Sequence, residues 1–322
     1  VNPLRGQNNV QGAADMGCQP HQGAGYFPVA DEKHQEFYTE KYGVTHPTKP
    51  GLKIPQMFEA AINKELKGLW IIGEDIVQTD PNSAHVIEAM NSLELLVVQE
   101  IFMSETAKLA TVVLPGTTFL EKDGTFTNTE RRIQRVNRAV PPLPGTKPDG
   151  LIVTEMMQKL GFDQPTYDAD QVLAEIADIV PFFKGVTRER LGKFGLQWPV
   201  QEDGTDTKIL HTETFKLGKG RLKNFDWKES SEIEANQKDY PLILTTSRVL
   251  QHYNAATMTR RTKNINIVDE DVLLIHPKDA AHRDLNTGDI GRLYSGRGEV
   301  ALKVEVTDKV KEGIVFTTFH FP

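Results

Sequence analysis

The pattern of apolar and polar residues divides the chain into three parts. Residues 1–50 are rich in Gly, Asn, Gln and Pro and show little periodicity, which predicts irregular structure with one short helix. Short apolar runs then alternate with amphipathic segments up to residue 150. The runs predict strands at 69–72, 95–99 and 112–114, and the amphipathic segments predict helices at 55–66, 83–91 and 104–109. Because strands that alternate with helices form parallel sheets, we expect a parallel sheet here.

The last third of the chain has a different pattern. Residues 151–181 are predicted to be helical, and residues 182–208 form a connector rich in Gly, Pro and charge. Short apolar runs separated by turn residues follow, which indicates a compact β-barrel. We expect a hairpin over 214–222 and strands at 242–246, 272–276, 291–294, 300–306 and 314–318. The sequence therefore predicts an α/β domain followed by a β-barrel domain, with a boundary near residue 205.

The amino-acid composition disfavours several classes of function. The 322 residues include 37 Lys and Arg against 44 Asp and Glu, so the net charge of −7 disfavours nonspecific binding of nucleic acid. The single cysteine, Cys18, excludes an intrachain disulfide and an iron–sulfur cluster built from this chain alone. No apolar run approaches the ~20 residues needed to span a bilayer. The nine histidines are scattered, and none of their spacings indicates a metal site.

The segment from residue 2 to residue 17 combines amide side chains with an arginine. Five amides and Arg5 lie within residues 2–11, and Gln7 is close to Arg5. Because a guanidinium binds a planar carboxylate through two parallel hydrogen bonds, the segment is a candidate anion site. The alternative is a polar turn in which the amides cap backbone groups.

Residues 73–81 (GEDIVQTDP) follow a predicted buried strand. Carboxylates at the C-terminal end of a parallel strand commonly bind a ribose or a base, so this segment and the ends of the next two strands form one candidate rim. The alternative is a helix-entry turn in which Asp80 or Asn82 caps the next helix.

Two further segments carry candidate anion-binding residues. In residues 123–134, the pair Arg131 and Arg132 is a candidate site for phosphate or for the acidic residues of a partner. The alternative is a solvated basic face paired with Glu130 and Glu121. Residues 245–254 place Arg248 and His252 after a strand, which suits an anionic ligand; the alternative is an ordinary surface loop.

Together and in this order, the four segments resemble the C-terminal half of the catalytic (alpha) subunit of molybdenum- or tungsten-dependent formate dehydrogenases. The resemblance covers nearly the whole chain and rests on NPLRGQNNVQGAADMG, GEDIVQTDP, VVQEIFMSETAKLATVVLPGTTFLEKDGTFTNTERRIQ and TTSRVLQHYNAATMTRR. It implies an irregular segment lining substrate and cofactor (1–50), a Rossmann-like α/β domain (51–204) and a double-psi-like β-barrel domain (205–322). The last two would bind molybdopterin guanine dinucleotide.

The resemblance also implies roles for individual residues. Arg5 resembles the active-site arginine that orients formate, and Phe319 and His320 lie near a cofactor contact. The other implied cofactor contacts are Gln7 near the pterin, Gly73, Glu74, Asp75, Thr79 and Gln99 on the sheet rim, Asp149 in a turn, and Arg248, His252 and Tyr253 on the barrel loop.

The implied activity is the reversible two-electron oxidation of formate to CO2 at a molybdenum or tungsten centre held by two such dinucleotides. The family's 4Fe–4S ligands and its Cys or selenocysteine metal ligand are absent here, so we expect them in an N-terminal half of the same subunit, and we read Cys18 as structural. Electron-transfer subunits and a cytoplasmic location are also expected, and this part alone is expected to be inactive. The alternative function is a non-catalytic cofactor-binding module or scaffold without the redox centre.

Overall fold

The computed structural model describes residues 4–215 and 217–321, which group into two compact units. Unit 1 comprises Val1–Glu74 and Ala84–Lys219, and unit 2 comprises Asp75–Ser83 and Gly220–Pro322. The expected domain limits at residues 50 and 204 remain predictions. Within the described residues, none of the helices has the length and apolar character needed to cross a membrane.

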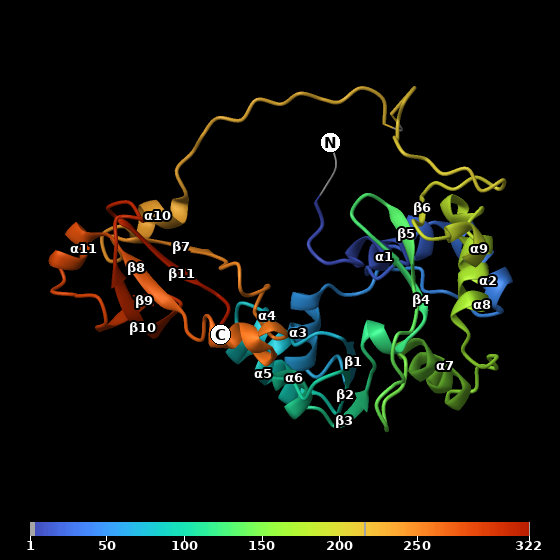
Figure 1. Cartoon of the computed structure of the whole chain (residues 1–322), viewed down its shortest axis with the longest axis horizontal. Helices are drawn as coiled ribbons and strands as arrows, with labels where there is room; N and C mark the ends of the chain where they lie inside the picture. Colours follow the sequence, from blue (N-terminus) through green and yellow to red (C-terminus); the bar gives the residue numbers. More distant parts are fainter. Residues whose placement is uncertain (1–3, 216, 322) are drawn as a thin grey trace. The chain divides into compact units, whose positions relative to one another are not determined.

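A three-stranded parallel sheet lies in unit 1 and confirms the alternating pattern (Figure 1). Its strands, in spatial order, are β1 (Gly68–Ile72), β2 (Leu95–Glu100) and β3 (Val112–Pro115). The register places Trp70 opposite Val97 and Val98 opposite Val113. The accompanying helices are α3 (Ile54–Ile62), α5 (Ser83–Ser92) and α6 (Glu105–Lys108). Ser104 caps α6 by accepting the N–H of Ala107 at 3.1 Å, as its position in the sequence predicts.

An antiparallel sheet forms the other half of unit 1. It contains β4 (Gly124–Thr127), β5 (Arg132–Val136) and β6 (Leu196–Gln197). Around it lie α1 (Val10–Asp15), η1 (Ala24–Tyr26), α2 (Glu32–Tyr42), η2 (Phe119–Glu121), α7 (Asp149–Lys159), α8 (Ala169–Ile179), η3 (Pro181–Phe183) and α9 (Arg188–Leu191). The core includes Ile133, Leu173, Phe183 and Leu191. The helical region expected over 151–181 is two helices, because the chain turns at Gly161, whose φ is +89°.

Unit 2 is built on a curled five-stranded mixed sheet of order β7-β11-β8-β10-β9 (Figure 1). The strands are β7 (Ile243–Ser247), β8 (Val272–Ile275), β9 (Ile290–Ser295), β10 (Gly298–Val306) and β11 (Ile314–Thr318). The helical elements of this unit are α4 (Ile76–Thr79), α10 (Ser231–Asn236), η4 (Thr259–Arg261), η5 (Lys263–Asn266) and α11 (Pro277–Ala281). Apolar residues from the sheet and α11 form its core, with Ile275 and Val304 almost fully buried.

The hairpin expected over 214–222 is absent from the described part of that segment; Lys216 lies outside the described residues. Between β6 and β7 the described residues contain α10 and no strand. Leu217 and Leu222 are almost fully exposed, so the segment has no apolar face to bury. A hairpin without such burial is only marginally stable in water, which explains the difference.

A fully buried carboxylate holds the first part of unit 1 together. Asp15 accepts hydrogen bonds from Gln11 Nε2 at 2.8 Å, Tyr26 Oη at 2.7 Å and Trp198 Nε1 at 2.9 Å. Burial raises the pKa of Asp15, while the three donors and then the positive charge of Arg5 lower it in part. This carboxylate therefore joins α1 and η1 to the segment that follows β6.

We expect Asp15→Ala to lower the free energy of unfolding of unit 1 by about 2 kcal/mol or more, since the half-buried donors of Tyr26 and Trp198 each lose their acceptor at a cost of about 1–3 kcal/mol, while Gln11 Nε2 keeps its bond to Tyr26 Oη. Asp15→Asn keeps one acceptor oxygen and should lose less. Urea denaturation followed by tryptophan fluorescence measures both. Asp163→Ala, on an exposed loop, is the control and should unfold like the wild type. Equal stability of Asp15→Ala and the wild type would contradict the role given to Asp15.

Candidate functional site

Two polar side chains meet at the C-terminal edge of the parallel sheet. Gln99, near the end of β2, donates from Nε2 to Asp149 Oδ1 at 2.7 Å, and Asp149 begins α7. The other carboxylate oxygen of Asp149 pairs with Lys122. Gln99 is 1% exposed, and its Oε1 has no hydrogen-bond partner among the described residues. A buried acceptor of this kind costs free energy unless a ligand satisfies it.

Glycines border this pair and leave room beside it. A Cβ on Gly116, which follows β3, would lie 3.1 Å from Asp149 Oδ1. Gly73 follows β1 with a φ of +65°, and its N–H donates to the carbonyl of Gln99 at 2.9 Å. A Cβ on Gly73 would meet nothing within 4 Å. The edge therefore offers an amide oxygen and a carboxylate to a ligand that carries N–H donors.

The remaining rim residues are not all brought together. Glu74 is exposed beside Gly73 in unit 1, whereas Asp75 and Thr79 belong to unit 2. Asp75 is buried, and its carbonyl accepts the N–H groups of Gln78 and Thr79 at the start of α4. Arg260 of η4 donates to Gln78, which fixes α4 within unit 2.

Arg5 and Gln7 are exposed and precede α1. The N–H of Arg5 donates to Thr129 Oγ1 at 2.7 Å, in the turn between β4 and β5. Four residues later, Asn9 Oδ1 accepts the N–H of Thr127 at 2.8 Å. The segment therefore lies along the turn, with the guanidinium of Arg5 close enough to Asp15 to lower its pKa in part against the effect of burial.

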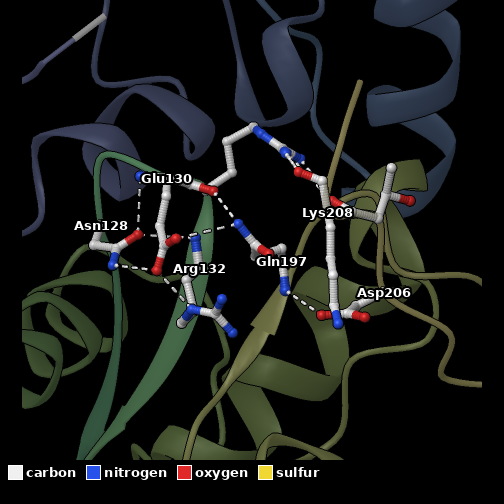
Figure 2. Close-up of polar contacts among 8 residues, drawn as sticks. Asn128, Glu130, Arg132, Gln197, Asp206 and Lys208 are labelled. Atoms are coloured by element: carbon white, nitrogen blue, oxygen red, sulfur yellow. Dashed lines mark hydrogen bonds and ion pairs between the residues drawn. The ribbon is translucent and has the colours of Figure 1, made fainter. Parts of the chain in front are cut away.

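The pair Arg131 and Arg132 is engaged within the chain, and Figure 2 shows the contact of Arg132 with Glu130. Arg131 donates to the carbonyls of Trp198, Thr207 and Lys208, and its guanidinium lies 5.3 Å from the centre of the Trp198 ring. Arg132 Nε donates to Glu130 at 2.7 Å. Glu121 instead accepts the N–H and hydroxyl of Thr118. These contacts favour the structural interpretation of the pair over a phosphate site.

The loop after β7 carries the second group of expected contacts. His252 is 4% exposed; its Nε2 donates to the Val268 carbonyl at 2.7 Å, and its Nδ1 lies 3.0 Å from Thr259 Oγ1. Arg248 and Tyr253 are exposed. The guanidinium of Arg248 lies 5.0 Å from the centre of the Phe319 ring. Arg248 and Tyr253 are thus the members of this set that present polar groups to solvent.

His320, which follows β11, anchors this loop from both ends. It is fully buried; its Nε2 accepts the N–H of Val249 at 3.0 Å, and its Nδ1 donates to the carbonyl of Asn254 at 2.6 Å. Because a backbone N–H only donates and a carbonyl only accepts, the two bonds fix one neutral tautomer. The family resemblance implies a cofactor contact near His320 but does not reveal this anchoring. The parallel pairing of β11 with β7 brings the two segments together.

Among the described residues, no group of three or more His, Cys, Asp or Glu side chains is placed to hold a metal ion. In unit 1 the candidate hydrogen-bonding groups are Arg5 and Gln7 and the Gln99–Asp149 pair with Gly73. In unit 2 they are the exposed residues of the loop after β7.

Comparison with known proteins assigns the chain to a class. Residues 4–159 match the family model of the molybdopterin oxidoreductases, and residues 242–322 match that of the molybdopterin dinucleotide binding domain. The chain therefore belongs to the molybdopterin oxidoreductase family.

Two of the similar proteins are formate dehydrogenase alpha subunits. The chain is 43% identical over 325 residues to the F420-dependent formate dehydrogenase subunit alpha of Methanocaldococcus jannaschii. It is 41% identical over 329 residues to F420-dependent formate dehydrogenase 1 subunit alpha of Methanococcus maripaludis. Each match covers 100% of this chain and 48% of the relative, so the chain spans about half their length.

A solved structure supports the fold. Acetylene hydratase from Pelobacter acetylenicus superposes with a TM-score of 0.63 at 20% sequence identity. The superposition covers 88% of this chain and 42% of the hydratase. At that identity, the likeness concerns the mixed α/β fold alone.

We expect His320→Phe to destabilise unit 2 by about 2–4 kcal/mol, because two buried backbone groups lose their partners. His320→Gln retains a donor and an acceptor and should recover part of this loss. Thermal unfolding measures stability, and hydrogen exchange at the Val249 amide reports the anchor directly. His282→Phe, at an exposed position, is the control. Unchanged exchange at Val249 in His320→Phe would show that the anchor is dispensable.

Proposed function

We propose that this chain is the formate-binding and cofactor-binding part of a formate dehydrogenase alpha subunit. The reaction is the reversible oxidation of formate to CO2, in which formate loses two electrons and one proton. The observation that carries the proposal is the match of the entire chain, at 41–43% identity, to proteins named as formate dehydrogenase alpha subunits. A non-catalytic scaffold has no comparable support.

The residues at the sheet edge fit a molybdopterin guanine dinucleotide. Guanine presents N–H donors, and the buried Oε1 of Gln99 together with the carboxylate of Asp149 are acceptors at neighbouring positions. Gly73 leaves open space at the same edge of unit 1, and Glu74 follows it in the chain. Asp75 and Thr79, which the resemblance also implies as cofactor contacts, belong to unit 2. Arg248, His252 and Tyr253 serve a dinucleotide on the loop of unit 2, where Arg248 suits phosphate.

When bound, two such dinucleotides with molybdenum or tungsten supply the redox chemistry, which no side chain of this chain provides. The task left to the chain is to bind and orient the substrate. Arg5 receives the formate carboxylate through charge-assisted hydrogen bonds, and Gln7 lies near the pterin.

The proposal extends to parts beyond this chain and to finer features of its fold. A 4Fe–4S cluster and the protein ligand of the metal belong to an N-terminal half of the same subunit, and further subunits carry the electrons away. The parallel sheet acts as a Rossmann-like cofactor domain, and the curled sheet of unit 2 as part of a double-psi-like barrel.

We expect Arg5→Lys to lower kcat/KM for formate by about 10- to 100-fold, because a lysine ammonium is a point charge and cannot form the paired bonds of a guanidinium. Cofactor content should stay unchanged. The assay is formate-dependent dye reduction by the full-length enzyme with its cofactors, corrected for bound metal. Near-normal turnover would refute the role of Arg5.

We expect Gln99→Leu to lower the guanine nucleotide bound per subunit severalfold after extended gel filtration, since one hydrogen bond of about 1–1.5 kcal/mol corresponds to roughly a five- to tenfold change in affinity. Acid release of the nucleotide and chromatography measure the content. Gln134→Leu, at an exposed position on β5, is the matched control. Equal nucleotide content in both variants would remove Gln99 from the cofactor site.

A further inference from the structure

The segment that bears Arg5 is held against the turn between β4 and β5. The N–H of Arg5 donates to Thr129 Oγ1 at 2.7 Å, and the N–H of Thr127 donates to Asn9 Oδ1 at 2.8 Å. Gly12 permits this close approach: a Cβ there would lie 2.3 Å from Asn9 Oδ1 and 3.3 Å from the Thr127 nitrogen. The chain from Arg5 to Gly12, which includes the start of α1, therefore lies close to the turn.

The turn itself is fixed by side chains on both of its sides (Figure 2). Asn128 Oδ1 accepts the N–H groups of Glu130 and Arg132, each at 3.0 Å. Gln197 of β6 donates from Nε2 to the Glu130 carbonyl at 3.0 Å. Arg131 adopts a φ of +66°, which its bonds to three backbone carbonyls and its contact with the Trp198 ring stabilise. These contacts therefore fix the backbone of the turn on both sides of Thr129.

We propose that Thr129 is a positioning residue for the formate site, with its hydroxyl fixing the backbone from which the Arg5 side chain projects. This inference rests on the proposed function, which assigns the carboxylate of formate to Arg5. The guanidinium stands on a long, flexible side chain, so its reach depends on where the Cα is held. A displacement of about 1 Å at a reacting group is enough to cost about 100-fold in rate.

Thr129 is not one of the core residues of unit 1. It is partly exposed and lies at a turn rather than in the core of unit 1. Removal of its hydroxyl should leave folding and cofactor content intact while the placement of Arg5 changes.

The test compares Thr129→Val and Thr129→Ser in the full-length enzyme loaded with its cofactors. Valine has the shape of threonine without the hydroxyl, whereas serine keeps it. We expect Thr129→Val to lower kcat/KM for formate by about 5- to 30-fold, mainly through KM, with unchanged metal and nucleotide content. Thr129→Ser should return kcat/KM to within about twofold of the wild type. Thr125→Val, on β4 of the same hairpin, is the matched control and should behave like the wild type.

The outcomes separate this inference from the proposed function. If Arg5→Lys impairs formate turnover but Thr129→Val does not, positioning by Thr129 is wrong while the role of Arg5 stands. If neither variant affects formate turnover, the proposed role of Arg5 is wrong as well. Equal impairment in the valine and serine variants would show that the hydroxyl is not the relevant group and would also overturn the inference.

Discussion

A carboxylate removed from water must be surrounded by donors, and in this chain that requirement organises the start of unit 1. The three donors to Asp15 come from α1, from η1 and from the segment after β6. Trp198, one of these donors, also lies beneath the guanidinium of Arg131 in the turn between β4 and β5. The same buried group thus links the segment carrying Arg5 to the turn that supports it, through residues far apart in the sequence.

Buried polar groups in this chain fall into two kinds. Asp15 and His320 have their hydrogen-bonding capacity used within the chain, so they rigidify the structure around them. Gln99 is equally buried, yet its carbonyl oxygen has no partner among the described residues. Asp15 and His320 therefore stabilise the structure around the site, whereas Gln99 is suited to bind a ligand. For the same reason Gln99 is a stronger candidate for a cofactor contact than His252, whose ring nitrogens are both engaged.

The sequence predicts elements well where burial leaves a local pattern. The runs at 69–72, 95–99 and 112–114 are the three parallel strands, and the run at 314–318 coincides with β11. It fails at 214–222, where apolar residues alternate with turn residues but have nothing to pack against. The family resemblance singles out Arg5, Gln99 and Asp149 as candidates. Their contacts were not predictable, because the Gln99–Asp149 bond spans 50 residues and the bond from Arg5 to Thr129 spans 124. The anchoring role of His320 was not predictable either, because its two partners lie 71 and 66 residues away in the sequence.

The strand order of unit 2 has a consequence for synthesis on the ribosome. Among the described strands, β7 is first in this sheet along the chain, but its neighbour is β11, which follows the other four. The strands β8, β9 and β10 can pair with one another as they emerge, whereas β7 stays an unpaired edge until β11 has been made. Ile243 and Leu244 stand exposed on β7 even in the finished sheet. The interval between β7 and β11 is therefore the period in which nascent unit 2 is most open to pairing with another chain.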